Sequence, residues 1–282
     1  MTHSFLMIGQ SNMAGRGFTA EVPAILDEGI KVLRNGRWQT MTEPVNYDRP
    51  VAGVSLAVSF AAALRHSNPQ AAVGLIPCAD GGSSIDEWAV DGPLFENAVT
   101  QARLAMRDST LAGILWHQGE ADSLPGNAER YTSKFGPVIA ALRAALNAPA
   151  IPLIVGGLGD FLVKGTYGKV FSSYQVVNDQ LLQYAESQPH CYFATAAGLT
   201  ANPDYIHFNA ASLRLFGIRY AEAFTKQQQI TAPLPFESAV LETIYNREMT
   251  VAEKTFELQL KFAHGKISVT TFQQELEQLQ PL

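Results

Sequence analysis

Several features that mark specialised classes of protein are scarce in this chain of 282 residues. It has only two cysteines, Cys78 and Cys191, which are too few for a disulfide framework and lie beside apolar runs typical of buried strands. Basic residues do not predominate: the net charge of −6 argues against a nucleic-acid partner. No apolar run reaches the roughly 18 residues that a membrane span needs. We therefore expect two buried thiols and no nucleic-acid or membrane partner.

The N-terminus and the histidines lack two further signatures. No basic segment precedes Phe5–Ile8 and no cleavage site follows it, so no secretory signal peptide is predicted and we expect a cytoplasmic protein. The six histidines are scattered, without a His-x-x-x-His pair or matching cysteines. The sequence therefore predicts no metal site.

The chain does contain a regular alternation of short apolar runs and longer amphipathic stretches. Such alternation is typical of parallel strands joined by helices, and strands that are apolar on both faces indicate a sheet covered on each side. The predicted strands are Phe5–Ile8, Ala72–Ile76, Leu111–Trp116, Ile151–Val155 and Cys191–Ala194. The predicted helices are Val54–Arg65, Leu94–Arg107, Ala128–Leu146, Val170–Ser187 and Ala210–Phe224. The sequence thus predicts an α/β fold, an open, doubly wound parallel sheet flanked by helices in a three-layer sandwich.

A hairpin insertion is predicted after the first strand. Asn35-Gly36 lies between Ile30–Leu33 and Arg37–Met41. Asn-Gly supplies the positive φ angles of a tight hairpin turn, so we expect a hairpin at the edge of the sheet.

The pattern changes near residue 230. Two prolines within residues 231–235 indicate a linker, and a capping box from Thr250 begins a helix that stops near Gly265. A second helix is predicted from Thr270. We therefore divide the chain into a core domain, residues 1–229, and a linker with a C-terminal helical hairpin, residues 230–282. Two short helices bury little alone, so this hairpin is expected to dock on the core or to mediate homo-oligomerisation.

Residues suited to acyl transfer follow the first strand and precede the last core helix. Ser11 lies in Gly9-Gln10-Ser11-Asn12-Met13, at the carboxyl end of a strand, where sites form in open α/β sheets. A serine hydroxyl needs an adjacent base, and that base needs an orienting partner. In Asp204-Tyr205-Ile206-His207, the carboxylate can accept the imidazole Nδ1–H and leave Nε2 facing a serine. Taken singly, these residues could equally be helix caps and a surface histidine.

A glycine pair follows the strand that ends at Ile76. Gly81 and Gly82 let backbone N–H groups approach a ligand closely, as an oxyanion hole requires. The same loop could be an ordinary connection from strand to helix.

A third strand end carries polar side chains in Trp116-His117-Gln118-Gly119-Glu120-Ala121-Asp122. Gln118 offers a side-chain amide donor at the same edge of the sheet. Glu120 and Asp122 are interpreted as residues that bond to neighbouring loops and hold the site in shape. Because parallel strands all end on one side of a sheet, the serine, the glycine loop and the glutamine are expected to converge there.

Together these segments resemble the SGNH hydrolase superfamily, and within it the branch of sialate O-acetylesterases and family 6 carbohydrate esterases. The resemblance spans about residues 4–224 and leaves out the C-terminal hairpin. Most of the superfamily has asparagine where Gln118 stands. The segments that carry the resemblance are Gly9–Gly15, Gly81–Ile85 with Trp88, Trp116–Glu120 and Asp204–His207.

The resemblance implies roles for these residues in ester hydrolysis through an acyl-enzyme, without a metal or organic cofactor. Ser11 would be the nucleophile, His207 the general acid and base, and Asp204 the residue that orients His207. The oxyanion hole would combine the N–H of Ser11, the N–H of Gly81 or Gly82, and the Gln118 amide. Asn12 and Glu120 would support the site.

Three substrate hypotheses stay open. The first expectation is an acetylated xylo- or manno-oligosaccharide, and the alternative is 9-O-acetylated sialic acid, whose carboxylate Arg16 or Arg49 would bind. A hypothesis of another class is a non-catalytic carbohydrate-binding protein on a degenerate hydrolase fold, with Trp88, Trp38 and Tyr47 stacked on sugar rings. Trp88 and Arg16 are the predicted substrate-binding residues, although core or hairpin packing and surface charge would also explain such side chains.

Overall fold

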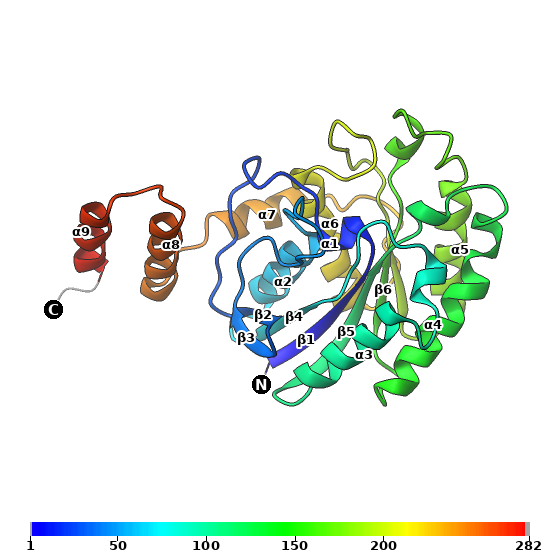
Figure 1. The fold of residues 1–282 in the computed structure, drawn as a ribbon, viewed down its shortest axis with the longest axis horizontal. Coiled ribbons are helices and arrows are strands. Elements are labelled where there is room, and N and C mark those ends of the chain that lie inside the picture. Colours follow the sequence, from blue (N-terminus) through cyan, green and yellow to red (C-terminus); the bar gives the residue numbers. More distant parts are fainter. Residues whose placement is uncertain (1, 280–282) are drawn as a thin grey trace.

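A central sheet is built from the predicted apolar runs. The computed structural model describes residues 2–279, and within them the sheet has seven strands in the order β3-β2-β4-β1-β5-β6-β7 (Figure 1). Strand β1 lies in the middle and pairs in parallel with β4 and β5. The five core strands, all at or near their predicted positions, are β1 (Thr2–Gly9), β4 (Ala72–Pro77), β5 (Ser109–His117), β6 (Leu153–Gly156) and β7 (Cys191–Ala194).

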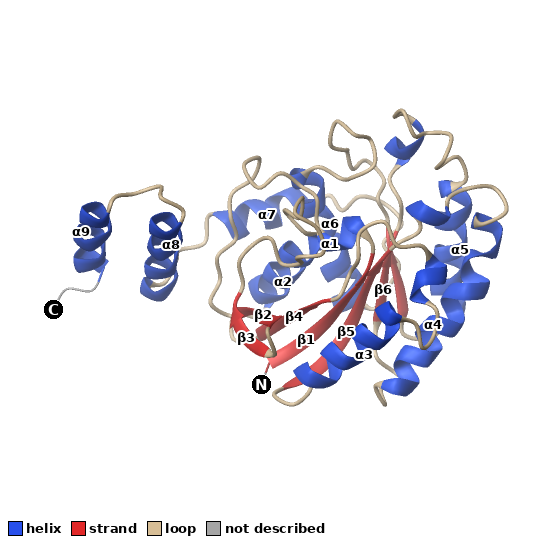
Figure 2. Cartoon of the chain, in the orientation of Figure 1, coloured by secondary structure: helices blue, strands red, loops and turns tan. Residues whose placement is uncertain are grey.

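Helices cover both faces of this sheet, so the α/β prediction is confirmed (Figure 2). Helices α2 (Leu56–Ser67) and α6 (Ala210–Lys226) pack together on one face. Their contact is close at Gly217, where a Cβ would lie 2.1 Å from Ser59 Oγ. The other face carries α3 (Pro93–Ala105), α4 (Tyr131–Ala145) and α5 (Tyr174–Ser187). Short helices in the connections are α1 (Ser11–Ala14), η1 (Ile85–Trp88), η2 (Glu120–Asp122), η3 (Ala128–Arg130) and η4 (Asp160–Val163).

The predicted hairpin is present and extends the sheet. Strands β2 (Ile30–Arg34) and β3 (Arg37–Thr40) are antiparallel, and φ is 51° at Asn35 and 72° at Gly36. Strand β2 also pairs in parallel with β4, so the hairpin forms one edge of the main sheet. Trp38 packs against Gly74, where a Cβ would lie 2.6 Å from the indole ring. Trp38 therefore has the packing role that the sequence allowed.

Both thiols are free and buried, as predicted. Burial raises the pKa of Cys78 and of Cys191 to about 12, so both stay protonated near neutral pH. No helix within residues 2–279 is long and apolar enough to cross a membrane.

The segment after residue 229 differs from the predicted linker. Ile230 is buried, and its backbone bonds to the β7 edge through Phe193 and Thr195. An unpredicted helix, α7 (Glu237–Tyr245), packs against α2 and α6. Buried Arg219 pairs with Glu237 through two hydrogen bonds of 2.7 Å. Residues 230–245 therefore belong to the body of the molecule, and the prolines mark a turn between a strand-like pairing and a helix.

The last two helices form the predicted hairpin, here called the C-terminal arm (residues 250–279). Helix α8 (Val251–Ala263) begins with the predicted capping box at Thr250 and Glu253, and Gly265 follows its end with φ 67°. Helix α9 (Val269–Leu279) packs on α8 and has no buried side chain in the described structure. The arm projects from the body (Figure 1).

Candidate active site

Ser11 stands at the carboxyl end of the central strand, as predicted. Helix α1 starts at Ser11, immediately after the turn at Gly9 and Gln10. Gly9 has φ 127°, and a Cβ there would lie 2.1 Å from the carbonyl oxygen of His117. The Gln10 N–H donates to the same oxygen at 2.9 Å. A glycine is required here because the end of β1 lies directly against the end of β5, and this contact fixes the position of Ser11.

The turn before α6 holds Asp204 against His207. Tyr205 has φ 55°, which lets the chain reverse so that Asp204 Oδ1 accepts the N–H groups of Ile206 and His207 at 2.9 and 3.0 Å. His207 Nδ1 donates to Asp204 Oδ2 at 2.7 Å. Burial raises the pKa of Asp204, but the hydrogen bonds from His207 and the backbone outweigh it and hold that pKa below its ordinary value. Asp204 is thus a carboxylate near neutral pH.

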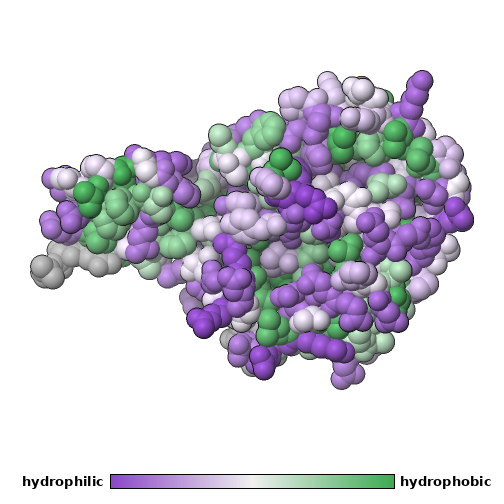
Figure 3. Space-filling model, viewed as in Figure 1, coloured by the Kyte–Doolittle hydropathy of each residue, from purple (hydrophilic) through white to green (hydrophobic). Residues whose placement is uncertain are grey.

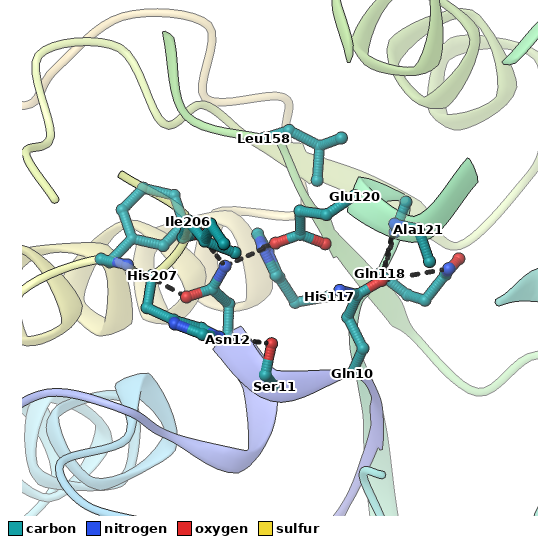
Figure 4. Close-up of polar contacts among 12 residues, drawn as sticks. Gln10, Ser11, Asn12, His117, Gln118, Glu120, Ala121, Leu158, Ile206 and His207 are labelled. Carbon is teal, nitrogen blue, oxygen red and sulfur yellow. Dashed lines mark hydrogen bonds and ion pairs between the residues drawn. The ribbon is translucent and has the colours of Figure 1, made fainter. Parts of the chain in front are cut away.

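The serine and the histidine meet across 196 positions of sequence. Ser11 Oγ lies 3.0 Å from His207 Nε2, which accepts the hydroxyl proton because Nδ1 already donates to Asp204 (Figure 4). Ser11 is buried, whereas the side chains of His207 and Asp204 are 22% and 43% exposed. The three residues therefore form a hydrogen-bonded series that opens to the surface.

Asn12 connects the serine segment to the histidine turn. Its Oδ1 accepts the Phe208 N–H at 3.0 Å, and its Nδ2 donates to the Ile206 carbonyl at 3.2 Å (Figure 4). Asn12 therefore bonds to the residue on each side of His207. The same Nδ2 also donates to Glu120 Oε1.

Glu120 is a buried anchor for this connection. Its Oε1 lies 3.2 Å from His117 Nε2, and both side chains are enclosed by protein. Burial raises the pKa of Glu120, but the charge and hydrogen bond of His117 and the hydrogen bond from Asn12 outweigh it, and the pKa is lowered. Asn12 and Glu120 thus lie where supporting residues were expected.

The backbone N–H groups of Gly81 and Gly82 differ in whether they are already hydrogen-bonded. The Gly81 N–H donates to Asp48 Oδ2 at 2.8 Å, so the Gly81 alternative is corrected. Gly82, with φ 85°, faces open space, and within residues 2–279 its N–H has no hydrogen-bond partner. The Ser11 N–H is likewise without a partner in the described chain. Within the described residues, the N–H groups of Ser11 and Gly82 are therefore free to donate.

Gln118 does not lie as predicted. Its side chain is fully buried and extends away from Ser11 (Figure 4). Its Nε2 donates to Asp122 Oδ2 at 2.6 Å and to the Ser83 carbonyl at 3.1 Å, with Gln10 Oε1 3.2 Å away. The oxyanion role predicted for Gln118 is corrected, because both amide hydrogens already have acceptors. Asp122, four residues further on, is the partner that holds the amide.

Neither predicted substrate-binding residue is free to bind substrate. Trp88 is fully buried, donates to Ser83 Oγ at 3.0 Å and packs edge-on against Trp116. Arg16 is buried and donates to Asp48 through two nitrogens, at 2.5 and 3.2 Å. Trp88 is therefore a core residue, and Arg16 belongs to a buried ion pair. Sequence reasoning missed Asp48, because no motif surrounds it.

An exposed tyrosine borders the site. Tyr205 is exposed beside Asp204, and Gly165 packs against it so closely that a Cβ would lie 2.7 Å from Tyr205 Cβ. The loop around Gly165 therefore borders the histidine turn. Within residues 2–279 no group of three or more His, Cys, Asp or Glu side chains could hold a metal ion.

This fold and this arrangement at the sheet edge define an esterase of the SGNH type. Residues 1–226 match the family model described as "Carbohydrate esterase, sialic acid-specific acetylesterase", and the chain belongs to this family. It is 28% identical over 248 residues to a probable carbohydrate esterase of Arabidopsis thaliana, At4g34215, covering 78% of this chain and 89% of that one.

Solved structures agree with this assignment. The crystal structure of the Arabidopsis thaliana protein AT4G34215 superposes with a TM-score of 0.69 at 26% identity, covering 80% of this chain and 98% of that one. NanS, at 17% identity, shares the fold with a TM-score of 0.64 over 80% of this chain and 97% of its own. The protein is thus a carboxylic ester hydrolase of a carbohydrate esterase family, which leaves no support for a non-catalytic sugar-binding protein.

Proposed function

We propose that this protein removes O-acetyl groups from carbohydrates through an acyl-enzyme formed on Ser11. The observation that carries the proposal is the series Ser11 Oγ, His207 and Asp204, joined at 3.0 and 2.7 Å. Nucleophilic acyl transfer requires a serine hydroxyl, a base within hydrogen-bond reach and a carboxylate that orients the base.

Each residue then has a defined part in two half-reactions. His207 Nε2 takes the proton of Ser11 as Oγ attacks the acetyl carbonyl, and Asp204 stabilises the imidazolium that forms. The C–O bond to the sugar breaks, and His207 returns the proton to the departing sugar oxygen. Water, deprotonated by His207, then attacks the acetyl-serine, and acetate leaves as Ser11 regains its proton.

The negative oxygen of each tetrahedral intermediate would lie between two backbone donors. The N–H groups of Ser11 and Gly82 are without protein partners in the described structure, and each belongs to a segment at the same edge of the sheet. An acetyl oxygen would complete their hydrogen bonding as charge develops. Of the hole that the sequence predicted, this pair keeps Ser11 and the Gly82 alternative and leaves out Gly81 and Gln118.

The charges around the site favour a neutral acetylated oligosaccharide over 9-O-acetyl sialate. Binding the sialate carboxylate would need a free cation, but Arg16 pairs with Asp48, and Arg49 pairs with Asp80 at 2.9 Å. The side chains of His207 and Asp204 are 22% and 43% exposed, which also suits a substrate that extends beyond one sugar.

A Ser11→Ala variant tests the proposal. We expect acetate release from acetylated xylo-oligosaccharides and from 9-O-acetyl sialate to fall to background, because the nucleophile is lost. Ser133→Ala, which alters an exposed serine on α4, is the matched control and should keep full activity. Acetate release by a folded Ser11→Ala variant at the rate of the unaltered protein would refute the assignment of the nucleophile. The ratio of the acetate-release rates of the unaltered protein on the two substrates decides between the sugars.

We also propose that the C-terminal arm pairs with the arm of a second copy. Hydrophobic surface lies along the arm (Figure 3), where Val251, Phe262 and Val269 are exposed. Helix α9 carries acidic charges, Glu275 and Glu277, and no basic residue, whereas the rest of the arm includes exposed lysines. A two-fold pairing that sets α9 against α8 of the other copy would bury the apolar faces. Helix α8 has two lysines and two glutamates, so it does not oppose the approach of the acidic α9.

A further inference from the structure

The peptide unit between Gly81 and Gly82 is held from one side only. In a trans peptide the C=O and the N–H point in opposite directions, so whatever binds the Gly81 carbonyl also aims the Gly82 N–H. Arg49 Nη2 donates to the Gly81 carbonyl at 3.1 Å. The Gly82 N–H therefore points away from Arg49, and it has no partner of its own within residues 2–279.

The peptide unit between Asp80 and Gly81 is held from the interior of the protein. Asp48 Oδ2 accepts the Gly81 N–H at 2.8 Å, and the same carboxylate receives two hydrogen bonds from Arg16 and one from Asn46. Asp48 and Arg16 are both buried, with side chains 3% and 6% exposed. Arg16 follows Ser11 by five positions, so Asp48 ties the glycine loop to the serine segment.

The loop is also fastened to the strand that leads to Ser11. The Asp80 N–H donates to the Gly9 carbonyl at 3.1 Å, and Asn46 Nδ2 donates to the Ala79 carbonyl at 3.0 Å. At Gly81 a Cβ would lie 2.4 Å from Arg16 Nη2 and 2.7 Å from Asp48 Oδ2, whereas Gly82 faces open space. Gly81 thus packs directly against the buried Arg16–Asp48 pair, and the open space lies next to Gly82.

We propose that Arg49 and the Arg16–Asp48 pair are positioning residues that hold the Gly82 N–H ready for the oxyanion. Arg49 fixes the Gly81 carbonyl from the solvent side, and Asp48 fixes the Gly81 N–H from the interior. With both ends of Gly81 tied, the next N–H is kept in one direction before substrate arrives. Preorganised donors of this kind are worth more than donors that must turn during the reaction. The inference rests on the proposed function of Ser11.

Arg49 is the residue to substitute, because its side chain is 48% exposed and its loss leaves the core intact. The substrate is p-nitrophenyl acetate, which has no negative charge for Arg49 to bind. Loss of an oxyanion donor outright costs about 10²–10³ in kcat, and a donor that is merely loosened costs less. We expect Arg49→Ala to lower kcat by about tenfold with KM little changed. Arg49→Lys, which can still donate to the Gly81 carbonyl, should recover part of the loss.

The control is Arg103→Ala, which removes another exposed arginine that donates to a backbone carbonyl, that of Ala145 at 2.8 Å. This variant should keep the full kcat. An Arg49→Ala protein with unchanged kcat on the neutral ester would overturn the inference. So would a raised KM confined to 9-O-acetyl sialate, because that result would make Arg49 a substrate-binding residue. A Ser11→Ala protein that still hydrolyses the ester would instead overturn the proposed function, whatever Arg49 does.

Discussion

At the scale of single residues, the polar side chains near Ser11 differ in whether they have free hydrogen-bonding groups. Gln118 has none to offer: Tyr131 donates to its Oε1 at 2.8 Å, and its amide hydrogens go to Asp122 and Ser83. Because buried polar groups stay bonded, such a side chain acts as a structural bridge. The groups that remain open are backbone N–H groups, whose direction depends on their neighbours.

The buried carboxylate of Asp48 leads to a prediction about pH. Burial raises the pKa of Asp48, but the hydrogen bonds and charge of Arg16 and the Gly81 N–H outweigh it, and the pKa lies below its ordinary value. The unfolded chain therefore takes up this proton first as the pH falls. The stabilisation is fully present above the unfolded pKa of about 4 and is lost as the pH drops through the lower folded pKa.

We expect the free energy of unfolding, measured by urea titration, to decline between about pH 5 and pH 2. In Asp48→Asn the decline should be shallower. Asp108→Asn, which alters an exposed carboxyl group, should follow the unaltered protein. Parallel curves for Asp48→Asn and the unaltered protein would show that this carboxylate contributes nothing to the acid sensitivity.

At the scale of elements, the site depends on how the ends of β1 and β5 meet the turn before α6. Asn12 makes this connection through the Phe208 N–H and the Ile206 carbonyl, and Glu120 holds Asn12 in turn. One amide side chain therefore sets where His207 lies relative to Ser11.

We expect Asn12→Ala to lower kcat by about 10- to 100-fold while KM changes little, because a small displacement of the base weakens proton transfer and not sugar binding. Steady-state kinetics on p-nitrophenyl acetate measures this. The control is Gln229→Ala, which removes another bridging amide, one that donates to the Ala185 carbonyl at 3.0 Å. Equal losses of kcat in both variants would indicate a general loss of stability instead of a role in placing His207.

Sequence patterns predicted the elements better than they predicted the direction of individual groups. The core strands were readable because each is a short run that is apolar on both faces. The Ser11 segment was readable because it follows such a run, and Asp204 and His207 because they lie three apart before the last core helix. Gly81 and Gly82 could not be told apart, because Asp48, 33 positions away, decides between them. The helix α7 was missed because the buried pair of Arg219 and Glu237, rather than a local pattern, ties it to the body.

At the scale of the whole molecule, the family match ends at residue 226, and the C-terminal arm lies beyond it. The arm contacts the body near its start, where Glu253 accepts the Glu28 N–H at 2.9 Å. Helix α9 is stacked on α8 through Phe272 and Phe262, whose ring centroids are 4.9 Å apart. Self-association through the arm should therefore be separable from ester hydrolysis.

We expect the protein to be a dimer in solution and Leu276→Glu to make it a monomer, because a charge on the half-buried face of α9 opposes its burial. Light scattering coupled to gel filtration measures the mass, and acetate release should be the same for both proteins. Gln273→Glu, an exposed position on α9, is the control for added charge. A monomer before substitution would refute the pairing of arms.

The openness of the Asp204–His207 couple has a consequence for the medium in which the enzyme works. Dissolved ions can approach a carboxylate that is 43% exposed, and at 0.15 M ionic strength they screen charges over roughly 8 Å. The contact between Asp204 and the imidazolium that arises during turnover is 2.7 Å long, well inside this length, so electrolyte weakens it in part, and more than it weakens the enclosed Arg16–Asp48 pair. The rate of this esterase should thus decrease as the salinity of its surroundings rises, while the framework around Gly82 keeps its shape.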